Sequence, residues 1–198
     1  MSTHHIAILA SGSGTNAEQI MSYFAPRTDV HVALIVSNNP KAGVLQKAKR
    51  FKVPTLVIDR EKLYKSNYVL EKFNQYGIDF VILAGFLWLV PQNLVAAYHK
   101  RIINIHPALL PKYGGKGMYG MHVHHAVIQA GERESGITIH YVNEHYDQGD
   151  IIFQARCQVA PNDRPEDLAG KVQALEHLHF PRIIDTLLQQ LPHKERIP

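Results

Sequence analysis

An asparagine and a histidine two residues apart, Asn104 and His106, stand at the end of a β-branched run and just before Pro107. Side chains alternate along a strand, so both residues would project from the same face. Pro107 holds His106 in extended geometry and keeps a helix from starting there. An amide donor beside a group that can be an acid, a base or a donor near pH 7 suits the polarisation of a carbonyl. The same pair could instead be a capped asparagine and a loop histidine.

A carboxylate further along the chain could complete this pair. Asp147 lies in an expected turn between two late strands, and Gly149 follows it two positions later. A carboxylate held near His106 could orient the imidazole and carry a proton during a reaction. Aspartate in a turn before glycine is also common for purely local reasons. The sequence leaves both interpretations of Asp147 open.

A glycine loop, Ser11 to Asn16, follows the first apolar run and precedes helix-like sequence. Glycines let backbone N–H groups approach a ligand, and a helix N-terminus favours an anion. The loop fits the loose glycine pattern of dinucleotide sites, but that pattern also needs a carboxylate at the end of the second strand. Residues 36–39, Val-Ser-Asn-Asn, supply none. We therefore expect a loop that holds one phosphate, with a tight turn that binds nothing as the alternative.

Short apolar runs alternate with helix-like segments through the first half of the chain. We expect strands at 6–10, 30–36, 55–58, 79–84 and up to His106, and helices at 17–24, 42–51, 66–76 and 91–98. This alternation predicts an α/β fold with a doubly wound, mostly parallel sheet and a Rossmann-like N-terminal half. Ligands bind such sheets at the carboxyl ends of the strands, where the glycine loop, the loop at 85–90 and the Asn104/His106 pair should meet.

The pattern changes after His106. The expected elements are a glycine-rich stretch at 112–121, a helix at 123–130, strands at 136–142 and 149–159, and a last helix from Arg164 that breaks near Pro181. Two consecutive strands joined by a short turn predict an antiparallel C-terminal addition to the sheet. We expect a single domain over residues 1–198, with a tail from Pro192 outside regular structure.

Composition excludes several classes of protein. The 198 residues are 45% hydrophobic and 19% charged, with a formal net charge of +4, as in an ordinary globular protein with one core. No basic stripe with interleaved aromatics suggests nucleic-acid binding, and the longest apolar run, 80–90, is too short to span a membrane. A single cysteine, Cys157, rules out an internal disulfide, and strand-like sequence begins too early for a leader. We therefore expect a cytoplasmic protein.

Other polar residues give weaker signals. His122, His124 and His125 lack a nearby acidic or cysteine partner, so we expect no metal site. Taken alone, Gln173 and Glu176 would form a solvated helix face, because they are three positions apart on a predicted helix. Cys157 is expected to be a buried structural thiol.

These motifs, in this order, resemble the phosphoribosylglycinamide formyltransferases, folate-dependent one-carbon transferases of the purine pathway. The resemblance covers nearly the whole chain, in the segments 11–16, 36–38, 83–86, 104–111, 136–140, 147–149, 172–173 and 176–177. The Asn-Ile-His-Pro and Asp-x-Gly segments are typical of folate formyltransferases in general. The glycine loop is similar to the phosphate grip of this family. The single domain, starting at its first strand, differs from methionyl-tRNA formyltransferases and formyltetrahydrofolate hydrolases, which carry a further domain.

The resemblance implies a formyl transfer from 10-formyltetrahydrofolate, as co-substrate, to the glycyl amine of phosphoribosylglycinamide, with no metal. It implies a nucleotide-phosphate half at about 1–100 and a folate-binding, catalytic half at about 101–198. The implied catalytic residues are Asn104, His106 and Asp147. The implied nucleotide-binding residues are Gly14, Thr15, Asn16, Gln173 and Glu176. The implied folate-binding residues are Lys65, Leu87, Trp88, Leu89, Val90, Asn104, Asn143, Glu144, His145 and Tyr146.

Two features depart from the resemblance. Trp88 stands where the family usually has arginine, and residues 116–120 look like an insertion, which leaves the roles of His122 and His124 open. Two other functions compete: hydrolysis of formyltetrahydrofolate, and a nucleotide-phosphate-binding module without catalysis. We expect small-molecule substrates, no nucleic-acid or membrane partner, and a monomer or homodimer.

Overall fold

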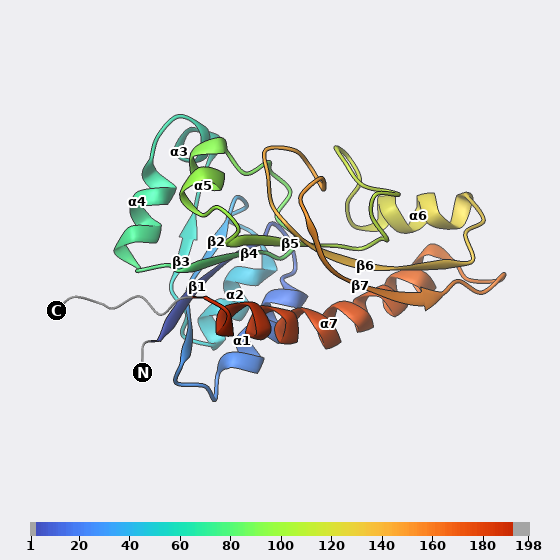
Figure 1. Ribbon diagram of the computed structural model, residues 1–198, viewed down its shortest axis with the longest axis horizontal. Coiled ribbons are helices and arrows are strands. Elements are labelled where there is room, and N and C mark those ends of the chain that lie inside the picture. Colours follow the sequence, from blue (N-terminus) through green and yellow to red (C-terminus); the bar gives the residue numbers. More distant parts are fainter. Residues whose placement is uncertain (1–2, 192–198) are drawn as a thin grey trace.

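The computed structural model describes residues 3–191, so the expected tail from Pro192 lies outside the described residues. A seven-stranded sheet crosses it (Figure 1). Its strands are His4–Leu9 (β1), Val30–Ser37 (β2), Thr55–Val57 (β3), Phe80–Leu83 (β4), Ile102–His106 (β5), Glu134–Tyr141 (β6) and Ile151–Gln158 (β7). In the order β3-β2-β1-β4-β5-β6-β7, the first five strands are parallel, and β6 and β7 are antiparallel to their neighbours. This confirms the predicted α/β fold, with its mostly parallel sheet and antiparallel addition.

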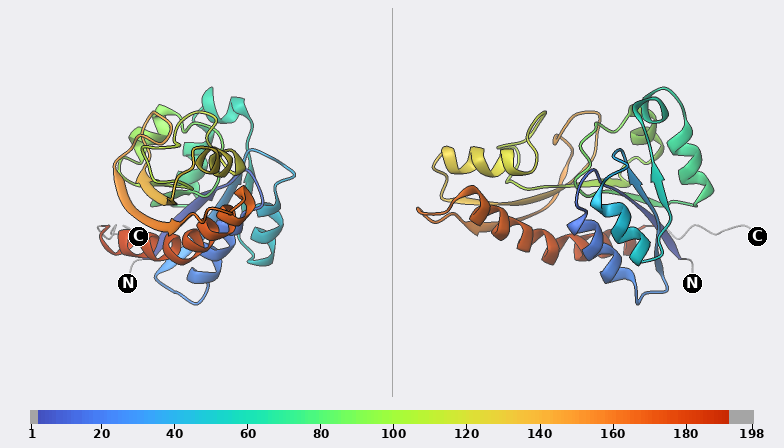
Figure 2. Two further views of the ribbon diagram at one scale, coloured as in Figure 1. Left: turned by 90° about the vertical axis from the view of Figure 1, so that its right-hand side faces the viewer. Right: turned by 180° about the vertical axis from the view of Figure 1, so that it is seen from behind.

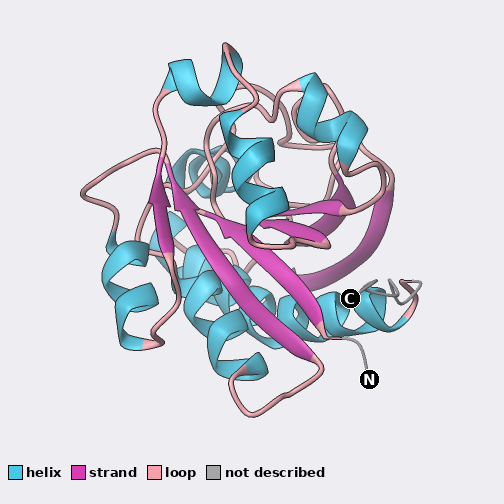
Figure 3. Ribbon diagram, turned by 90° about the vertical axis from the view of Figure 1, so that its left-hand side faces the viewer, coloured by secondary structure: helices cyan, strands magenta, loops and turns pink. Residues whose placement is uncertain are grey.

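Helices cover both faces of the sheet (Figure 3). They are Thr15–Phe24 (α1), Gly43–Arg50 (α2), Arg60–Tyr64 (α3), Tyr68–Gln75 (α4), Gln92–Ala97 (α5), Met121–Gln129 (α6) and Pro165–Gln189 (α7). Seen from behind, α1, α2 and α7 lie over one face of the parallel strands (Figure 2). The other face carries α3, α4 and α5, and β6 and β7 extend away from the parallel strands beside α6 (Figure 1).

Strand alternation divides the core into two layers, one on each face of the sheet. In β5, Ile103 and Ile105 pack into the core that includes α1, α2 and α7, whereas Ile102 packs into the core that includes α3, α4 and α5. Asn104 and His106 therefore share the face of Ile102. This confirms that the two polar side chains leave the strand on the same side.

The direction in which successive strands are added to the sheet reverses between β1 and β4. From β1 the chain winds outward through β2 and β3, and it then returns to place β4 and β5 on the other side of β1. Loops that follow the two central strands diverge at such a point and leave a crevice at their carboxyl ends. Ser11 ties these loops together: its N–H donates to the Gly85 carbonyl at 3.0 Å, and its Oγ accepts from the Leu87 N–H at 2.9 Å.

The helix predicted at 66–76 is α4 in the structure, and a second short helix, α3, precedes it. The prediction missed α3, which begins after Asp59. The Asp59 carboxylate accepts from the Lys62 N–H at 2.8 Å and so caps the helix. An aspartate followed by the first helical turn was the sequence signal for this short helix.

The predicted break of the last helix near Pro181 was wrong, because α7 runs without interruption from Pro165 to Gln189. Proline removes one helical hydrogen bond and normally bends or ends a helix. Here Phe180 and Ile184, on either side of Pro181, are fully buried in the core beneath the sheet. Their packing holds both halves of α7 on one path.

Candidate active site

A cavity of about 830 Å³ opens at the carboxyl ends of the central strands. The glycine loop, the 85–90 loop, Asn104 and His106 of β5, the loop after β6 and one face of α7 all line it. The predicted site residues in its wall are Gly14, Thr15, Asn16, Leu87, Trp88, Leu89, Val90, Asn104, His106, Asn143, His145, Tyr146, Asp147, Gln173 and Glu176. Lys65 and Glu144 are exposed and do not line this cavity in the described part of the chain.

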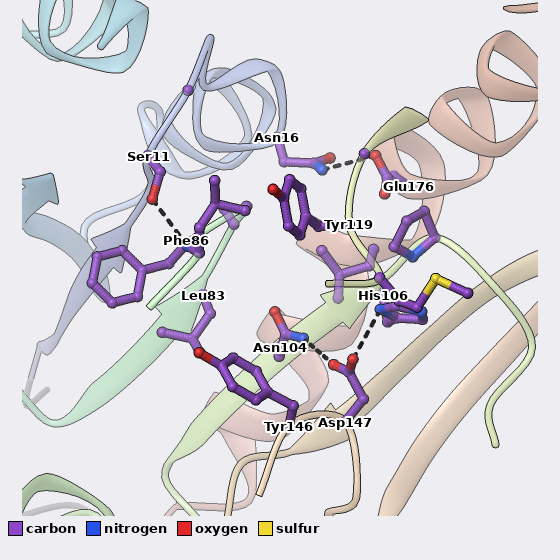
Figure 4. A pocket seen from close by; sticks show the side chains of 18 of the residues that line it. Ser11, Asn16, Leu83, Phe86, Asn104, His106, Tyr119, Tyr146, Asp147 and Glu176 are labelled. Carbon is purple, nitrogen blue, oxygen red and sulfur yellow. Dashed lines mark hydrogen bonds and ion pairs between the residues drawn. The ribbon is translucent and has the colours of Figure 1, made fainter. Parts of the chain in front are cut away.

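One carboxylate meets both polar side chains of β5 (Figure 4). Oδ1 of Asp147 lies 3.4 Å from the Asn104 amide nitrogen, and Oδ2 lies 3.5 Å from Nδ1 of His106. His106 and Asp147 come from segments 41 positions apart in the sequence, and the antiparallel return of the chain through β6 brings them together. The structure therefore assembles the predicted trio.

The ring of His106 has a defined orientation. Its Nε2 lies 2.8 Å from the Tyr113 carbonyl oxygen, which can only accept, so Nε2 carries a proton and Nδ1 faces Asp147. Burial lowers the pKa of the imidazole below its ordinary value, and the charge of Asp147 opposes this shift only in part. Burial therefore favours the neutral ring, in which Nδ1 can accept a proton.

Asp147 is held rigidly by its backbone and by its neighbours. It adopts a left-handed conformation with φ 57°, and its Oδ2 accepts from the Gly115 N–H at 2.9 Å. Two positions later, a Cβ on Gly149 would lie 1.7 Å from the Tyr141 carbonyl oxygen, so only glycine allows this loop to approach β6. Burial alone would raise the pKa of Asp147, but contacts with His140, His106 and Gly115 outweigh it and lower the pKa.

The glycine loop has the geometry expected of an anion site. Gly14 precedes α1 with φ 71° and offers no side-chain cap, so N–H groups of the first helical turn face the cavity end of the loop without a capping oxygen. A Cβ on Gly14 would lie 2.5 Å from Cβ of Val44, because α2 packs against the loop there. At Gly12 an added Cβ would meet no atom within 4 Å. The loop thus has a packed side and an open side.

Comparisons with known proteins agree with this geometry. The family model described as Formyl transferase matches residues 4–184. The chain belongs to the formyl transferase family. This match confirms the resemblance to formyltransferases that the sequence motifs suggested.

Several named relatives align over most of this family member. A chloroplastic phosphoribosylglycinamide formyltransferase of Arabidopsis thaliana is 40% identical over 191 residues, covering 93% of this chain and 65% of the relative. The phosphoribosylglycinamide formyltransferase of Bacillus subtilis is 33% identical over 187 residues, covering 92% and 93%. The crystal structure of the enzyme of that name from Bacillus halodurans has a TM-score of 0.83 and 40% identity, covering 94% and 96%. The chain thus spans less than two thirds of the plant relative but nearly all of the bacterial ones.

A second histidine, which the sequence analysis had not assigned to the site, stands beside the cluster of this family member. His140 of β6 pairs with Asn104 in the antiparallel register, and its Nε2 lies 3.1 Å from the Asn104 amide nitrogen. Its Nδ1 lies 2.8 Å from the Tyr141 carbonyl oxygen, so Nδ1 carries a proton, and Nε2 is the acceptor that faces the Asn104 amide. The alternation of β6 was visible in the sequence, but its register against β5 was not.

The far end of the cavity is closed by α7. Gln173 donates to Thr15 Oγ1 at a long 3.4 Å, and the Asn16 amide donates to Glu176 Oε2 at 2.9 Å. Burial raises the pKa of the Glu176 carboxyl, and the bond from Asn16 offsets this in part. Taken alone, the pair looked like a solvated helix face; Gln173 is indeed exposed, but Glu176 is partly buried in the cavity wall.

The opposite end of the cavity is aromatic and apolar. Leu87 is 45% exposed at its rim, and Tyr146 reaches into it from the loop after β6 (Figure 4). Trp88 carries the Arg60 guanidinium over its ring at 5.1 Å. The 115–121 stretch adds Tyr119 to the wall, which the sequence analysis had not assigned.

The histidines of α6 divide between the surface and the cavity. His124 is buried in the cavity wall, where burial lowers the pKa of its imidazole, and His122 packs edge-on against Tyr119.

Within residues 3–191, no group of three or more histidine, cysteine, aspartate or glutamate side chains is arranged to hold a metal ion. The described helices also include none with the length and apolar character needed to cross a membrane.

Proposed function

We propose that this chain transfers the formyl group of 10-formyltetrahydrofolate to the glycyl amine of phosphoribosylglycinamide, a step of purine biosynthesis. One observation carries the proposal: a single cavity joins a glycine loop suited to phosphate with the Asn104, His106 and Asp147 cluster. The named relatives, two of them bacterial and aligned over nearly their whole length, support the same activity.

The cavity suits two substrates placed side by side. The nucleotide would lie between the glycine loop and α7, with its phosphate at the N-terminus of α1 and its ribose at Gln173 and Glu176. The pterin would enter the aromatic end between Leu87–Val90 and Asn143–Tyr146. The two reacting atoms would then meet above Asn104. Holding both reactants in this geometry accounts for a large part of the rate enhancement.

The amine attacks the formyl carbon and the formyl oxygen gains negative charge. Asn104 is placed to donate to that oxygen, provided that its amide exchanges the long 3.4 Å contact with Asp147 for the new acceptor. The second N–H of the amide stays on His140. This hydrogen bond stabilises the transition state more than the bound substrates, because the oxygen is charged only in the transition state.

The amine must also lose a proton, and N10 of the folate must gain one as the carbon–nitrogen bond breaks. Nδ1 of neutral His106 faces Asp147, so a proton received there lies between the imidazole and the carboxylate. The resulting imidazolium stabilises the oxyanion by its charge and not by a hydrogen bond, because both ring nitrogens point to protein acceptors. The same proton then passes to N10 as the carbon–nitrogen bond breaks. Burial favours a ring that is neutral before the reaction and gains its proton during it.

Folate deformylation followed by absorbance, with and without the glycine nucleotide, tests the proposal directly. Turnover that requires the nucleotide supports the transferase. Turnover at the same rate with water alone would show a hydrolase instead. A chain that binds the nucleotide but never deformylates the folate would be a binding module.

We also propose that the chain works as one domain in the cytoplasm, on small-molecule substrates. The continuity of the sheet across both halves of the sequence supports the single domain. A monomer or a homodimer is compatible with a cavity lined by one copy of the chain. Light scattering of the purified protein distinguishes the two oligomeric states.

A further inference from the structure

The side chain of Asn16 points away from the phosphate end of the glycine loop. It leaves the first turn of α1, is 9% exposed, and donates its amide N–H to Oε2 of Glu176 on α7 at 2.9 Å (Figure 4). Its carbonyl oxygen, Oδ1, is buried and has no hydrogen-bond partner in the described part of the chain. The amide thus donates its N–H to the Glu176 carboxyl group while its own oxygen accepts no hydrogen bond from the described residues.

Glu176 has one oxygen held and one available. Oε2 accepts from Asn16, whereas Oε1 accepts no hydrogen bond from residues 3–191, and the carboxylate lines the cavity. In dinucleotide folds a carboxylate at the end of the second strand accepts from the ribose hydroxyls. In this chain that position, at residues 36–39, has no carboxylate. The carboxylate that lines the cavity here, Glu176, instead comes from α7.

From these contacts we propose that Asn16 is a positioning residue for the nucleotide: it holds Oε2 of Glu176 so that Oε1 accepts a ribose hydroxyl. This inference rests on the proposed function, because it assigns the nucleotide to the end of the cavity between α1 and α7. It gives Asn16 a role separate from phosphate contact, which the backbone of the same turn can make.

A purely structural role for the contact is the alternative. Asn16 and Glu176 lie on α1 and α7, and the contact could simply dock these helices. The helices are, however, already joined further along by Asp185, which accepts from Tyr23 and Arg27 at 3.0 Å each. Ile20 of α1 also belongs to the same buried core as α7. The contact at the cavity end is therefore not needed to bring the helices together.

Reversing the polarity of the contact separates the two roles. In the double variant Asn16→Asp with Glu176→Gln, the amide and the carboxylate exchange places, and one hydrogen bond between α1 and α7 is kept. Asn16→Asp alone places two carboxylates against each other and removes that hydrogen bond. A positioning role predicts that the double variant recovers the melting temperature lost in Asn16→Asp but keeps a raised nucleotide KM. The expected rise is roughly ten- to hundredfold, the value of one hydrogen bond to a charged group.

The measurements are the melting temperature, both KM values and kcat of the full chain. Tyr23→Phe is the matched control: it removes a contact between the same helices away from the cavity and should leave the nucleotide KM unchanged. Recovery of both the melting temperature and the nucleotide KM in the double variant would overturn the inference. Should the double variant not fold, Asn16→Ala decides: a raised nucleotide KM supports the inference, and an unchanged one overturns it. Wild-type protein that shows no nucleotide-dependent turnover would instead refute the proposed function.

Discussion

Nε2 of His140 and the amide nitrogen of Asn104 face each other at 3.1 Å across two antiparallel strands. Together with the 3.4 Å contact to Asp147, this occupies both N–H groups of the Asn104 amide before any ligand arrives. The shorter contact fixes the orientation of the amide, and the longer one can be given up to a formyl oxygen. The contact with His140 thus sets which amide hydrogen Asn104 can offer to a ligand.

Removing the acceptor on His140 should misorient Asn104. We expect His140→Leu to lower kcat roughly ten- to hundredfold, with small changes in both KM values, because the lost orientation matters most when the oxygen is charged. His140→Gln keeps an amide oxygen near the position of Nε2 and should retain most of the activity. The test is to measure kcat and both KM values of the two variants and of the wild type by steady-state kinetics. Equal losses in both would show that packing of the buried ring matters, and not its acceptor.

Asn104 itself should act mainly in the transition state. We expect Asn104→Ala to lower kcat by roughly 100- to 1,000-fold, the usual cost of one oxyanion donor. Asn104→Asp should be no better, since a carboxylate repels the oxyanion. Single-turnover rates are to be measured beside melting temperatures. A rate per folded molecule within a few-fold of wild type would make β5 a scaffold and remove Asn104 from the mechanism.

The pH dependence should report the coupled His106 and Asp147 pair. The pKa of His106 is lowered by burial, so we expect kcat/KM to fall only below the ordinary imidazole range as the ring becomes protonated. The charge of Asp147 raises that pKa in part; Asp147→Asn therefore lowers it further, and the acid limb should move to lower pH while kcat falls. The left-handed backbone of residue 147 tolerates asparagine. An acid limb at the same pH in Asp147→Asn as in wild type would show that a group other than His106 titrates there.

The two glycines of the loop should respond differently to a single added methyl group. Gly12→Ala fits the protein itself, because its Cβ meets nothing within 4 Å, but it would crowd a bound phosphate. We expect the nucleotide KM to rise roughly tenfold with an unchanged melting temperature. Gly14→Ala places Cβ against Val44 at a positive φ, so it should destabilise the fold by about 1–3 kcal/mol. A normal nucleotide KM in Gly12→Ala would argue against a phosphate in this loop.

Local sequence determined the elements and part of the site. Period-two alternation placed Asn104 and His106 on one face of β5, and the strand, glycine loop and helix order placed Gly14 at the start of α1. These features depend on neighbours a few positions away, so the sequence is enough to predict them. The short helix α3 was missed because its signal, the Asp59 cap, spans only one turn.

Tertiary structure decided which distant residues meet. The register of β6 puts His140 against Asn104, and the path of α7 brings Glu176 to Asn16, 160 positions earlier in the chain. Buried packing also carries α7 through Pro181, against its local preference. Strand register and helix docking depend on the sum of many long-range apolar contacts, which no short stretch of sequence contains. The sequence was enough to single out Asn104, His106 and Asp147, whereas the partners that orient them came only with the fold.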